Sequence, residues 1–140
     1  MAKVAVIFWS GTGNTEAMAK YIQEGAKAAG HEVSLKEVAQ ASAADVTDAD
    51  IAVLGCPSMG DEVLEESEFE PFVESIESRV SGKKLALFGS YDWGDGLWMR
   101  NWTERMQKAG ATLVAESLIV NNTPEGEDIE RCKAFGKSLS

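Results

Sequence analysis

The chain has 140 residues, a length typical of one domain, and its 44% hydrophobic and 26% charged residues are typical of a folded globular protein. With 23 acidic against 13 basic residues its formal net charge is -10, which argues against nucleic-acid binding, because phosphate backbones require cationic partners. The acidity suits a protein kept soluble by its charge, or one that meets basic surfaces. No apolar run is long enough for a secretory signal or a membrane span, and the two separated cysteines are typical of a reducing compartment. We therefore expect a single cytoplasmic domain over residues 1–140.

Apolar runs and helical patterns alternate from one end of the chain to the other. The expected strands are residues 3–9, 31–37, 51–55, 84–89 and 112–121. The expected helices are residues 14–29, 69–79, 98–109 and 125–139, with a short one near Ala43. This alternation predicts an α/β fold, in which a parallel sheet is covered by helices on both faces. Ligands of such folds bind at the carboxyl ends of the strands, so the loops after the strands are the candidate site.

The first predicted strand ends in a turn rich in hydroxyl groups and glycine, with the sequence WSGTGNT. Two glycines permit a tight turn, and the next helix offers free N–H groups and the positive end of its dipole, which suits a phosphate. The turn has no Lys, which excludes a Walker loop, and Glu16 stands where a dinucleotide fold has its third glycine. We expect one terminal phosphate here, although a plain helix cap could use the same residues. The candidate cradle consists of Ser10, Gly11, Thr12, Gly13, Asn14 and Thr15.

Three further loops follow predicted strands and therefore belong to the same edge of the sheet. In CPSMGDE, Met59 at the loop apex can lie against a flat ring, and Gly60 permits a change of backbone conformation. In SYDWGDG, Trp93 stands in a loop, where aromatic side chains often cover a ligand or a partner. Either side chain could instead pack into the core. After the last strand, Asn122 can add a polar contact or cap the final helix.

Together the loops offer a phosphate cradle, a thioether, an indole and a flexible glycine at one edge. This combination indicates a site for a flat aromatic ring that carries one phosphate. Trp98 and Trp102 have helical spacing and are expected in the core. Cys56 and Cys132 are expected to be structural thiols, and His31 has no expected role.

The motifs WSGTGNT, GCPSMGDE, FGSYDWGDGLWM and the ending LIVNN-P resemble the short-chain flavodoxins, which are small electron carriers that hold FMN. The motifs occur in the right order and at compatible spacing over nearly the whole chain. The resemblance implies a flavodoxin-like, doubly wound five-stranded parallel sheet of order 2-1-3-4-5, a topology for which flavodoxin is itself a standard example. It also implies a monomer with FMN at the edge between the first and third strands.

The resemblance implies a role for each motif. The turn from Ser10 to Thr15 would hold the FMN phosphate, while Met59 and Trp93 would lie on opposite faces of the isoalloxazine ring. The Gly60–Asp61 peptide would turn over on reduction and offer its carbonyl to the protonated N5, and Glu62 would meet the N3 edge. The other site residues that it implies are Pro57, Ser58, Ser90, Tyr91, Asp92, Gly94, Gly96 and Asn122.

Eight acidic residues and no basic residue stand between Asp61 and Glu77, so no cation is supplied to a reduced ring. A hydrogen bond gained only on reduction would favour the neutral semiquinone, and the missing cation would disfavour the anionic hydroquinone. We therefore expect a low-potential one-electron carrier that shuttles between these two states. Asp92 stands where the family usually has Gly; its carboxylate is expected to lower the second potential, and a positive φ there would strain it. The acidic run would also suit a solvated helix face.

The alternative function is an enzyme, an FMN-dependent NAD(P)H:quinone reductase on a related fold. Such an enzyme needs room over one ring face, of which Met59 and Trp93 would leave little, and the chain has no insertion to build a second substrate site. A phospho-receiver domain requires acids after the first strand, where this chain has none. We expect an electron-transfer protein whose partners present basic docking surfaces, without nucleic acid, membrane or metal.

Overall fold

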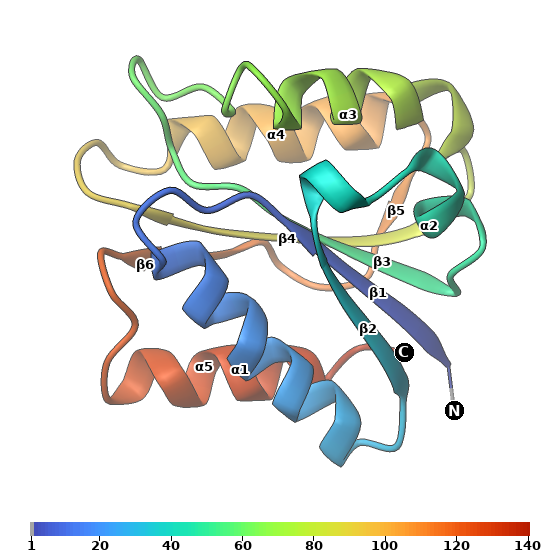
Figure 1. Ribbon diagram of the computed structural model, residues 1–140, viewed down its shortest axis with the longest axis horizontal. Helices are drawn as coiled ribbons and strands as arrows, with labels where there is room; N and C mark the ends of the chain where they lie inside the picture. The colour runs from blue at the N-terminus through green and yellow to red at the C-terminus, as the bar shows by residue number, and fades with distance from the viewer. Residues whose placement is uncertain (1) are drawn as a thin grey trace.

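A computed structural model describes residues 2–140, and its strands and helices alternate along the chain (Figure 1). The strands are β1 (Lys3–Phe8), β2 (Glu32–Glu37), β3 (Ile51–Gly55), β4 (Lys84–Tyr91), β5 (Thr112–Leu113) and β6 (Leu118–Asn121). The helices are α1 (Asn14–Ala28), α2 (Ala43–Thr47), α3 (Phe69–Ile76), α4 (Leu97–Lys108) and α5 (Glu127–Lys137), with 3-10 turns at Val38–Gln40 and Glu77–Arg79.

The strands form one parallel sheet in the order β2-β1-β3-β4-β5, with β6 also paired to β4. Helices α1 and α5 cover one face of the sheet, and α2, α3 and α4 cover the other (Figure 1). The expected fold class and strand order are therefore confirmed. β1 and β3 lie in the interior of this sheet, and their near-continuous apolar sequences KVAVIF and IAVLG are what a strand covered on both faces requires.

Two apolar cores result, one on each face of the sheet. The core beneath α3 and α4 contains Trp98 and Trp102, each 2% exposed, as the helical spacing predicts. Phe69 of α3 meets Trp102 edge to face, with ring centroids 5.4 Å apart. The core beneath α1 and α5 contains Met18, and Cys132 lies on the inner face of α5. Both faces of the sheet are thus anchored by helices that begin at its carboxyl edge.

Helices α1 and α5 cross at two glycines, which brings their backbones close together. A Cβ atom on Gly25 would lie 2.0 Å from the carbonyl oxygen of Lys133, and one on Gly136 would lie 2.1 Å from that of Ile22. Real Cβ atoms do not approach so closely, so the crossing requires glycine on both helices. Because α1 starts at the candidate phosphate turn, this crossing helps to position that turn.

The prediction of one continuous strand at residues 112–121 is wrong, because this segment forms two strands, β5 and β6. From Leu85 to Phe88 strand β4 advances three residues, while the paired outer strand advances five, from Leu113 to Leu118. The two surplus residues cannot pair and bulge from the edge of the sheet, as in other bulges. The Ser117 hydroxyl is instead hydrogen-bonded to the Thr103 hydroxyl of α4, at 2.7 Å. Strand β6 thereby regains its register beside the end of β4.

Candidate functional site

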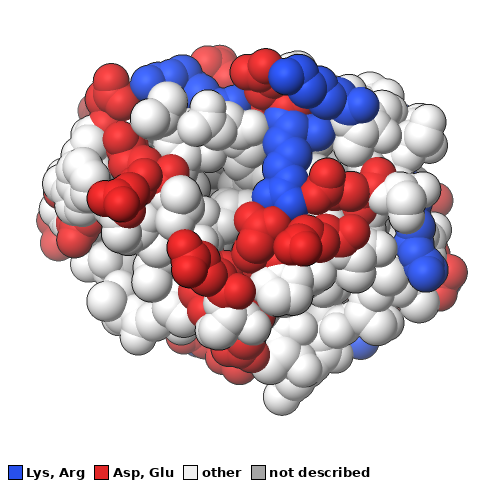
Figure 2. Space-filling model, turned by 90° about the horizontal axis from the view of Figure 1, so that it is seen from above, with Lys and Arg blue, Asp and Glu red and all other residues white. Residues whose placement is uncertain are grey.

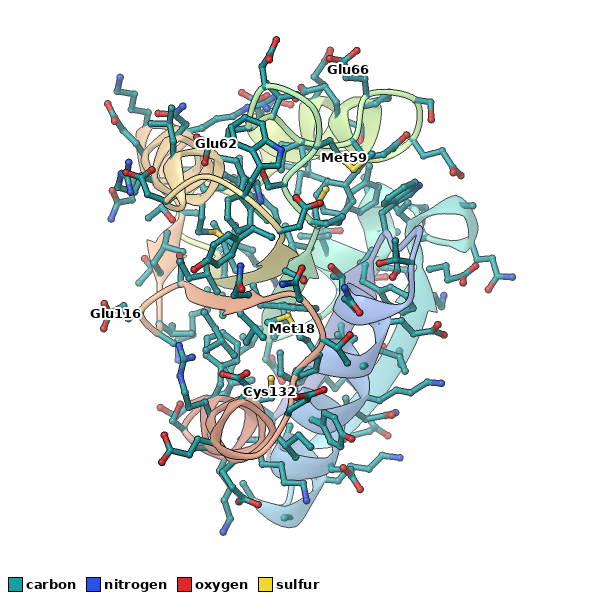
Figure 3. The ribbon with its side chains drawn as sticks, turned by 90° about the vertical axis from the view of Figure 1, so that its left-hand side faces the viewer. Met18, Met59, Glu62, Glu66, Glu116 and Cys132 are labelled. Carbon is teal, nitrogen blue, oxygen red and sulfur yellow. The ribbon has the colours of Figure 1, made fainter. Side chains whose placement is uncertain are left out.

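The loops after β1, β3, β4 and β6 meet at one edge of the sheet, the edge that faces the viewer in Figure 3. Backbone hydrogen bonds hold them together beyond the ends of the strands. The Ser58 N–H donates to the Ser90 carbonyl at 3.0 Å, and the Asn122 N–H donates to the Tyr91 carbonyl at 2.7 Å. The three loops therefore form one continuous wall opposite the turn that precedes α1.

The turn that precedes α1 has the geometry of an anion cradle. Gly13 is the N-cap of α1 in the left-handed region, with φ 97°, and its N–H donates to the Ser10 hydroxyl at 3.1 Å. No side chain of residues 2–140 caps the first turn of α1, so the N–H groups of this turn stay available. The Thr15 side chain is 1% exposed, and its hydroxyl has no hydrogen-bond partner among residues 2–140. A buried hydroxyl without a partner is costly, and a phosphate oxygen would relieve it.

The loop after β3 closes on itself in a tight turn. Met59 and Val63 exchange two backbone hydrogen bonds, of 2.9 and 3.0 Å, around Gly60, Asp61 and Glu62. Both Gly60 (φ 45°) and Glu62 (φ 56°) lie in the left-handed region. A side chain on Gly60 would meet nothing within 4 Å, so the requirement there is conformational and not steric. Glycine is therefore favoured at position 60 by its backbone conformation.

The loop after β4 presents aromatic side chains of two kinds. Tyr91 packs against Trp98, with ring centroids 5.7 Å apart, and belongs to the wall of the site. Trp93 is 55% exposed, so it is not folded back into the core. The Ser90 hydroxyl donates to the Asn122 carbonyl at 2.8 Å, which ties this loop to the loop after β6. An indole that stands in solvent beside the site is available to cover a ligand.

A cavity of about 300 Å³ opens between these loops. Most of the sequence-predicted site residues line it together, namely Ser10, Gly11, Thr12, Asn14, Thr15, Pro57, Ser58, Met59, Ser90, Tyr91, Asp92 and Asn122. The lining contains no Lys or Arg, so its donors are neutral. The predicted residues outside the lining are Gly13, Gly60, Asp61, Glu62, Trp93, Gly94 and Gly96. These belong to the cradle's helix cap or to the outer parts of the two loops.

Trp9 also lines the cavity, although the sequence analysis gave it no role. Its indole packs on Gly11, where an added Cβ would lie 3.0 Å from the ring. Its Nε1–H donates to the Glu68 carboxylate at 3.2 Å, across 59 residues of chain. The sequence around Trp9 predicts only the end of a buried strand. Its partner Glu68 lies far away in the chain, so no pattern near Trp9 predicts that it is held at the cradle.

Glu65 does not belong to a solvated helix face, which corrects the simplest interpretation of the acidic run. It is 6% exposed, and its carboxylate accepts hydrogen bonds from the N–H groups of Glu68 and Phe69, both at 2.8 Å. The N–H and hydroxyl of Ser67 donate to its other oxygen. Burial by itself opposes ionisation, but these donors outweigh it and hold the pKa of Glu65 below its usual value. Glu65 therefore fixes the start of α3 beside the Met59 loop.

The acidic run is also partly neutralised by α4. The Arg105 guanidinium binds the Glu70 carboxylate, with a shortest distance of 2.6 Å, and also the Glu77 carboxylate. The hydrogen bonds that Arg105 donates to Glu70 raise the pKa of Arg105 further, so this cation stays charged. Figure 2 shows acidic side chains spread over this face and basic ones in several groups, one of which forms a stripe near the centre. The acidic residues of α3 and the turn after it thus have a cationic partner from α4, whereas no salt bridge is found for the acidic residues of the loop before α3 among the described residues.

Asp92 lines the cavity with an ordinary backbone. Among residues 2–140 the non-glycine residues with positive φ are Glu62 and Asn122, so the strain considered for Asp92 does not arise. Its side chain is exposed at the mouth of the cavity. The fold therefore accommodates Asp92 without backbone strain.

The two cysteines are buried, as expected for structural thiols. Burial raises the pKa of Cys56 well above its usual value and that of Cys132 to about 11, so neither is a thiolate near neutral pH. His31 has a structural role that the sequence does not reveal. Its Nδ1 accepts from the Ala2 N–H at 3.1 Å, and its Nε2 lies 2.8 Å from the Leu139 carbonyl oxygen. It joins the two ends of the described chain, far from the cavity.

Larger hollows occur elsewhere on the surface, but they lack the features of the site. One, of about 690 Å³, lies over α3 and α4 around Arg105, whose charge is already paired. Another, of about 880 Å³, follows the bulge between β5 and β6. Neither includes a free helix N-terminus with an unpartnered hydroxyl. Within residues 2–140, no helix has the length and the apolar character that crossing a membrane would require.

Comparisons with known proteins agree with the geometry of this edge. The family model described as Flavodoxin matches residues 6–136. A flavodoxin of Clostridium beijerinckii is 50% identical over 96% of this chain and 97% of its own length, and one of Megasphaera elsdenii is 44% identical over 98% of each. The solution structure of two-electron reduced Megasphaera elsdenii flavodoxin superposes with a TM-score of 0.87 at 42% identity, covering 96% of both chains. The chain therefore belongs to the flavodoxin family, whose members carry electrons on bound FMN and are not enzymes.

Proposed function

We propose that this flavodoxin binds FMN in the cavity between the α1 turn and the three loops opposite, and works as a low-potential one-electron carrier. The observation that carries the proposal is the Thr15 hydroxyl, which is buried without a partner at the base of a neutral cradle. A phosphate placed there would meet this hydroxyl and the free N–H groups at the start of α1. FMN supplies one-electron chemistry when bound, and the residues of the cavity bind and orient it.

The ring of the cofactor would lie farther out, between the Met59 loop and the Trp93 loop. Met59 lines the cavity, and Trp93 stands exposed beside it, so the two side chains are available to opposite ring faces. The Gly60–Asp61 peptide would offer its carbonyl to N5, and Glu62 would meet the N3 edge. The ribityl chain and ring edge would contact Pro57, Ser58, Ser90, Tyr91, Asp92, Gly94, Gly96 and Asn122.

Charge around the site favours a low potential. The cavity lining has no basic residue, and Asp92 stands at its mouth. Asp61, Glu62 and Glu66 add further acids in the loop before α3, while Arg105 is already bound to Glu70 and Glu77, and Arg100 to Asp95. A negative charge gained by the ring on full reduction would meet other negative charges at close range. The residues of this site therefore resist the second electron.

An electron carrier of this family has redox partners, and we propose that those of this chain present basic docking surfaces. The formal net charge is -10, and Trp93 is exposed between Asp92 and Asp95 in the sequence. Opposite charges would steer the encounter and bring a partner's cofactor to the flavin edge. We further propose a monomeric, single-domain protein in the cytoplasm, for which sedimentation and fractionation are the direct measurements.

The test compares FMN with riboflavin, which lacks the phosphate. We expect FMN to bind at least about a hundredfold more tightly, because the cradle contributes several charge-assisted hydrogen bonds. Equal affinities for FMN and riboflavin would overturn the proposal that the turn before α1 binds the phosphate. Anaerobic potentiometry should then resolve two one-electron steps, with the second more negative. Turnover of NADH with a quinone by the purified protein would instead favour the reductase alternative.

A further inference from the structure

The Glu62 carboxylate joins the two loops that flank the proposed ring position. Its Oε1 accepts a hydrogen bond from the N–H of Leu97, the first residue of α4, at 3.1 Å. Figure 3 shows Glu62 lying beside α4, whereas Met59 of the same loop lies away from that helix and Glu66 points outward. The loop after β3 is thus attached through this side chain to the end of the loop after β4.

The start of α4 lacks any capping group of its own. Its N-cap is Gly96, which has no side chain, and the first turn of the helix contains no acidic residue. The unpaired N–H groups and the positive end of the helix dipole favour a negative charge at this point. Glu62 supplies that charge from a loop 35 residues earlier in the chain.

The backbone on both sides is shaped to receive this carboxylate. A Cβ atom on Gly94 (φ 88°) would lie 2.6 Å from the Glu62 Oε1, so the carboxylate occupies the space where a side chain would begin. Glu62 itself adopts φ 56°, which a non-glycine residue rarely does, and the paired Met59 and Val63 hold it there. The contact is therefore built into both loops.

We propose that Glu62 is a positioning residue, a latch that sets the spacing between the Met59 loop and the Trp93 loop before the flavin enters. The proposal rests on the proposed function, because the space between these loops is the ring position. Among the described residues, Oε2 of Glu62 forms no hydrogen bond, so one carboxylate can hold α4 through Oε1 and still meet the ring edge through Oε2. Loss of the latch would leave the ring pocket without a defined width.

The experiment measures the Leu97 amide in the flavin-free chain by ¹H–¹⁵N spectroscopy and hydrogen exchange. Two variants remove the latch in different ways: Glu62→Ala deletes the acceptor, and Gly94→Ala displaces it with a methyl group while keeping its charge. Both should shift the Leu97 amide resonance upfield and speed its exchange about tenfold, as expected for one charge-assisted hydrogen bond.

Matched controls exist for both variants. Glu66→Ala removes the same charge from an exposed neighbour of Glu62, and Gly30→Ala adds the same methyl group at nearly the same φ, 93°, where nothing lies within 4 Å. Neither control should change the Leu97 signals. A Leu97 amide that is unaffected by Glu62→Ala would overturn the latch.

A binding measurement separates the latch from simple helix capping. Gly94→Ala should weaken riboflavin binding about tenfold, because the pocket width is no longer set. Unchanged riboflavin affinity with an altered Leu97 amide would confine Glu62 to capping α4 and overturn its positioning role. Since these results concern the ring and the flavin-free chain, they stand apart from the phosphate comparison that tests the proposed function.

Discussion

At the scale of single residues, the Thr15 hydroxyl is the feature on which the proposed phosphate cradle rests. Its hydroxyl is buried and unpartnered, which costs the flavin-free chain stability. Thr15→Val replaces that hydroxyl with a methyl group of nearly the same size. We expect the free energy of unfolding of the flavin-free chain to stay equal or rise by about 1 kcal/mol, while FMN affinity falls about ten- to hundredfold.

Riboflavin provides the control for this variant, since it has no phosphate to lose. Calorimetric titration of both flavins, together with urea unfolding, checks the prediction. If Thr15→Val weakens both flavins alike, the hydroxyl does not serve the phosphate.

Asp92 is an exposed acid that lines the cavity. Removing its charge should make the second one-electron potential less negative. For an assumed separation of ~7 Å and an exposed side chain, we expect Asp92→Asn to raise that potential by roughly 30 mV. Spectroelectrochemistry of the FMN-loaded protein measures both potentials.

Asp95 serves as the comparison for Asp92, because Asp95→Asn changes the net charge by the same amount three residues farther on. Its carboxylate is bound to Arg100 at 3.1 Å and does not line the cavity. A much smaller shift is expected. Equal shifts for the two variants would mean that net charge, and not the position of Asp92, governs the potential.

At the scale of an element, the start of α3 depends on the buried Glu65. Its folded-state pKa is lowered, so its stabilising effect is present above the unfolded value of about 4.3 and is lost as the pH falls through the folded value. Glu65→Gln should therefore lower the free energy of unfolding by about 1–3 kcal/mol near neutral pH. Urea unfolding of both proteins over a pH series should show the difference shrinking in acid.

Glu74→Gln is the control for this element, because Glu74 is exposed on the same helix. It should change stability little at any pH. A difference between wild type and Glu65→Gln that stays constant into acid would show that the ionised carboxylate is not what fixes the turn.

At the α1–α5 crossing, we expect replacement of glycine by alanine to destabilise the protein. Alanine normally stabilises a helix relative to glycine, by about 0.8–1.0 kcal/mol. At Gly136 the added methyl group would lie 2.1 Å from the Ile22 carbonyl oxygen, so the helices must separate. We expect Gly136→Ala to lower the free energy of unfolding by about 1–3 kcal/mol, as measured by chemical denaturation. A stabilised Gly136→Ala protein would contradict the crossing.

At the scale of the whole molecule, charge should govern how the protein meets its partners. The formal net charge of -10 predicts attraction to a basic redox protein that weakens with ionic strength. Stopped-flow reduction of a basic c-type cytochrome by the reduced protein should slow about tenfold between low salt and ~0.5 M salt. An acidic cytochrome should show the opposite trend. Rates independent of salt with both would rule out electrostatic docking.

The sequence by itself determined the fold, and it predicted most of the residues that line the candidate cavity. Apolar runs such as IAVLG require a strand covered on both faces, and the alternation with helices then requires a parallel sheet whose loops meet at one edge. The turn from Ser10 to Thr15 is predicted as a phosphate cradle from a short stretch of sequence, because its glycines, its hydroxyl groups and the start of a helix are adjacent in the chain. The spacing of Trp98 and Trp102 likewise placed them in the core.

Only the tertiary structure decided which polar groups are already paired and which are free. Glu65 and Glu68 stand three residues apart in the same acidic run, yet one is buried at the start of α3 and the other binds Trp9 at the cradle. The split between β5 and β6 arises because the outer strand has two more residues than the part of β4 that it pairs with. The sequence of residues 112–121 alone does not show this mismatch. Glu62 finds Leu97 for the same reason. Hydrogen bonds between different loops depend on distances in the folded chain, and local patterns of residues do not predict these distances.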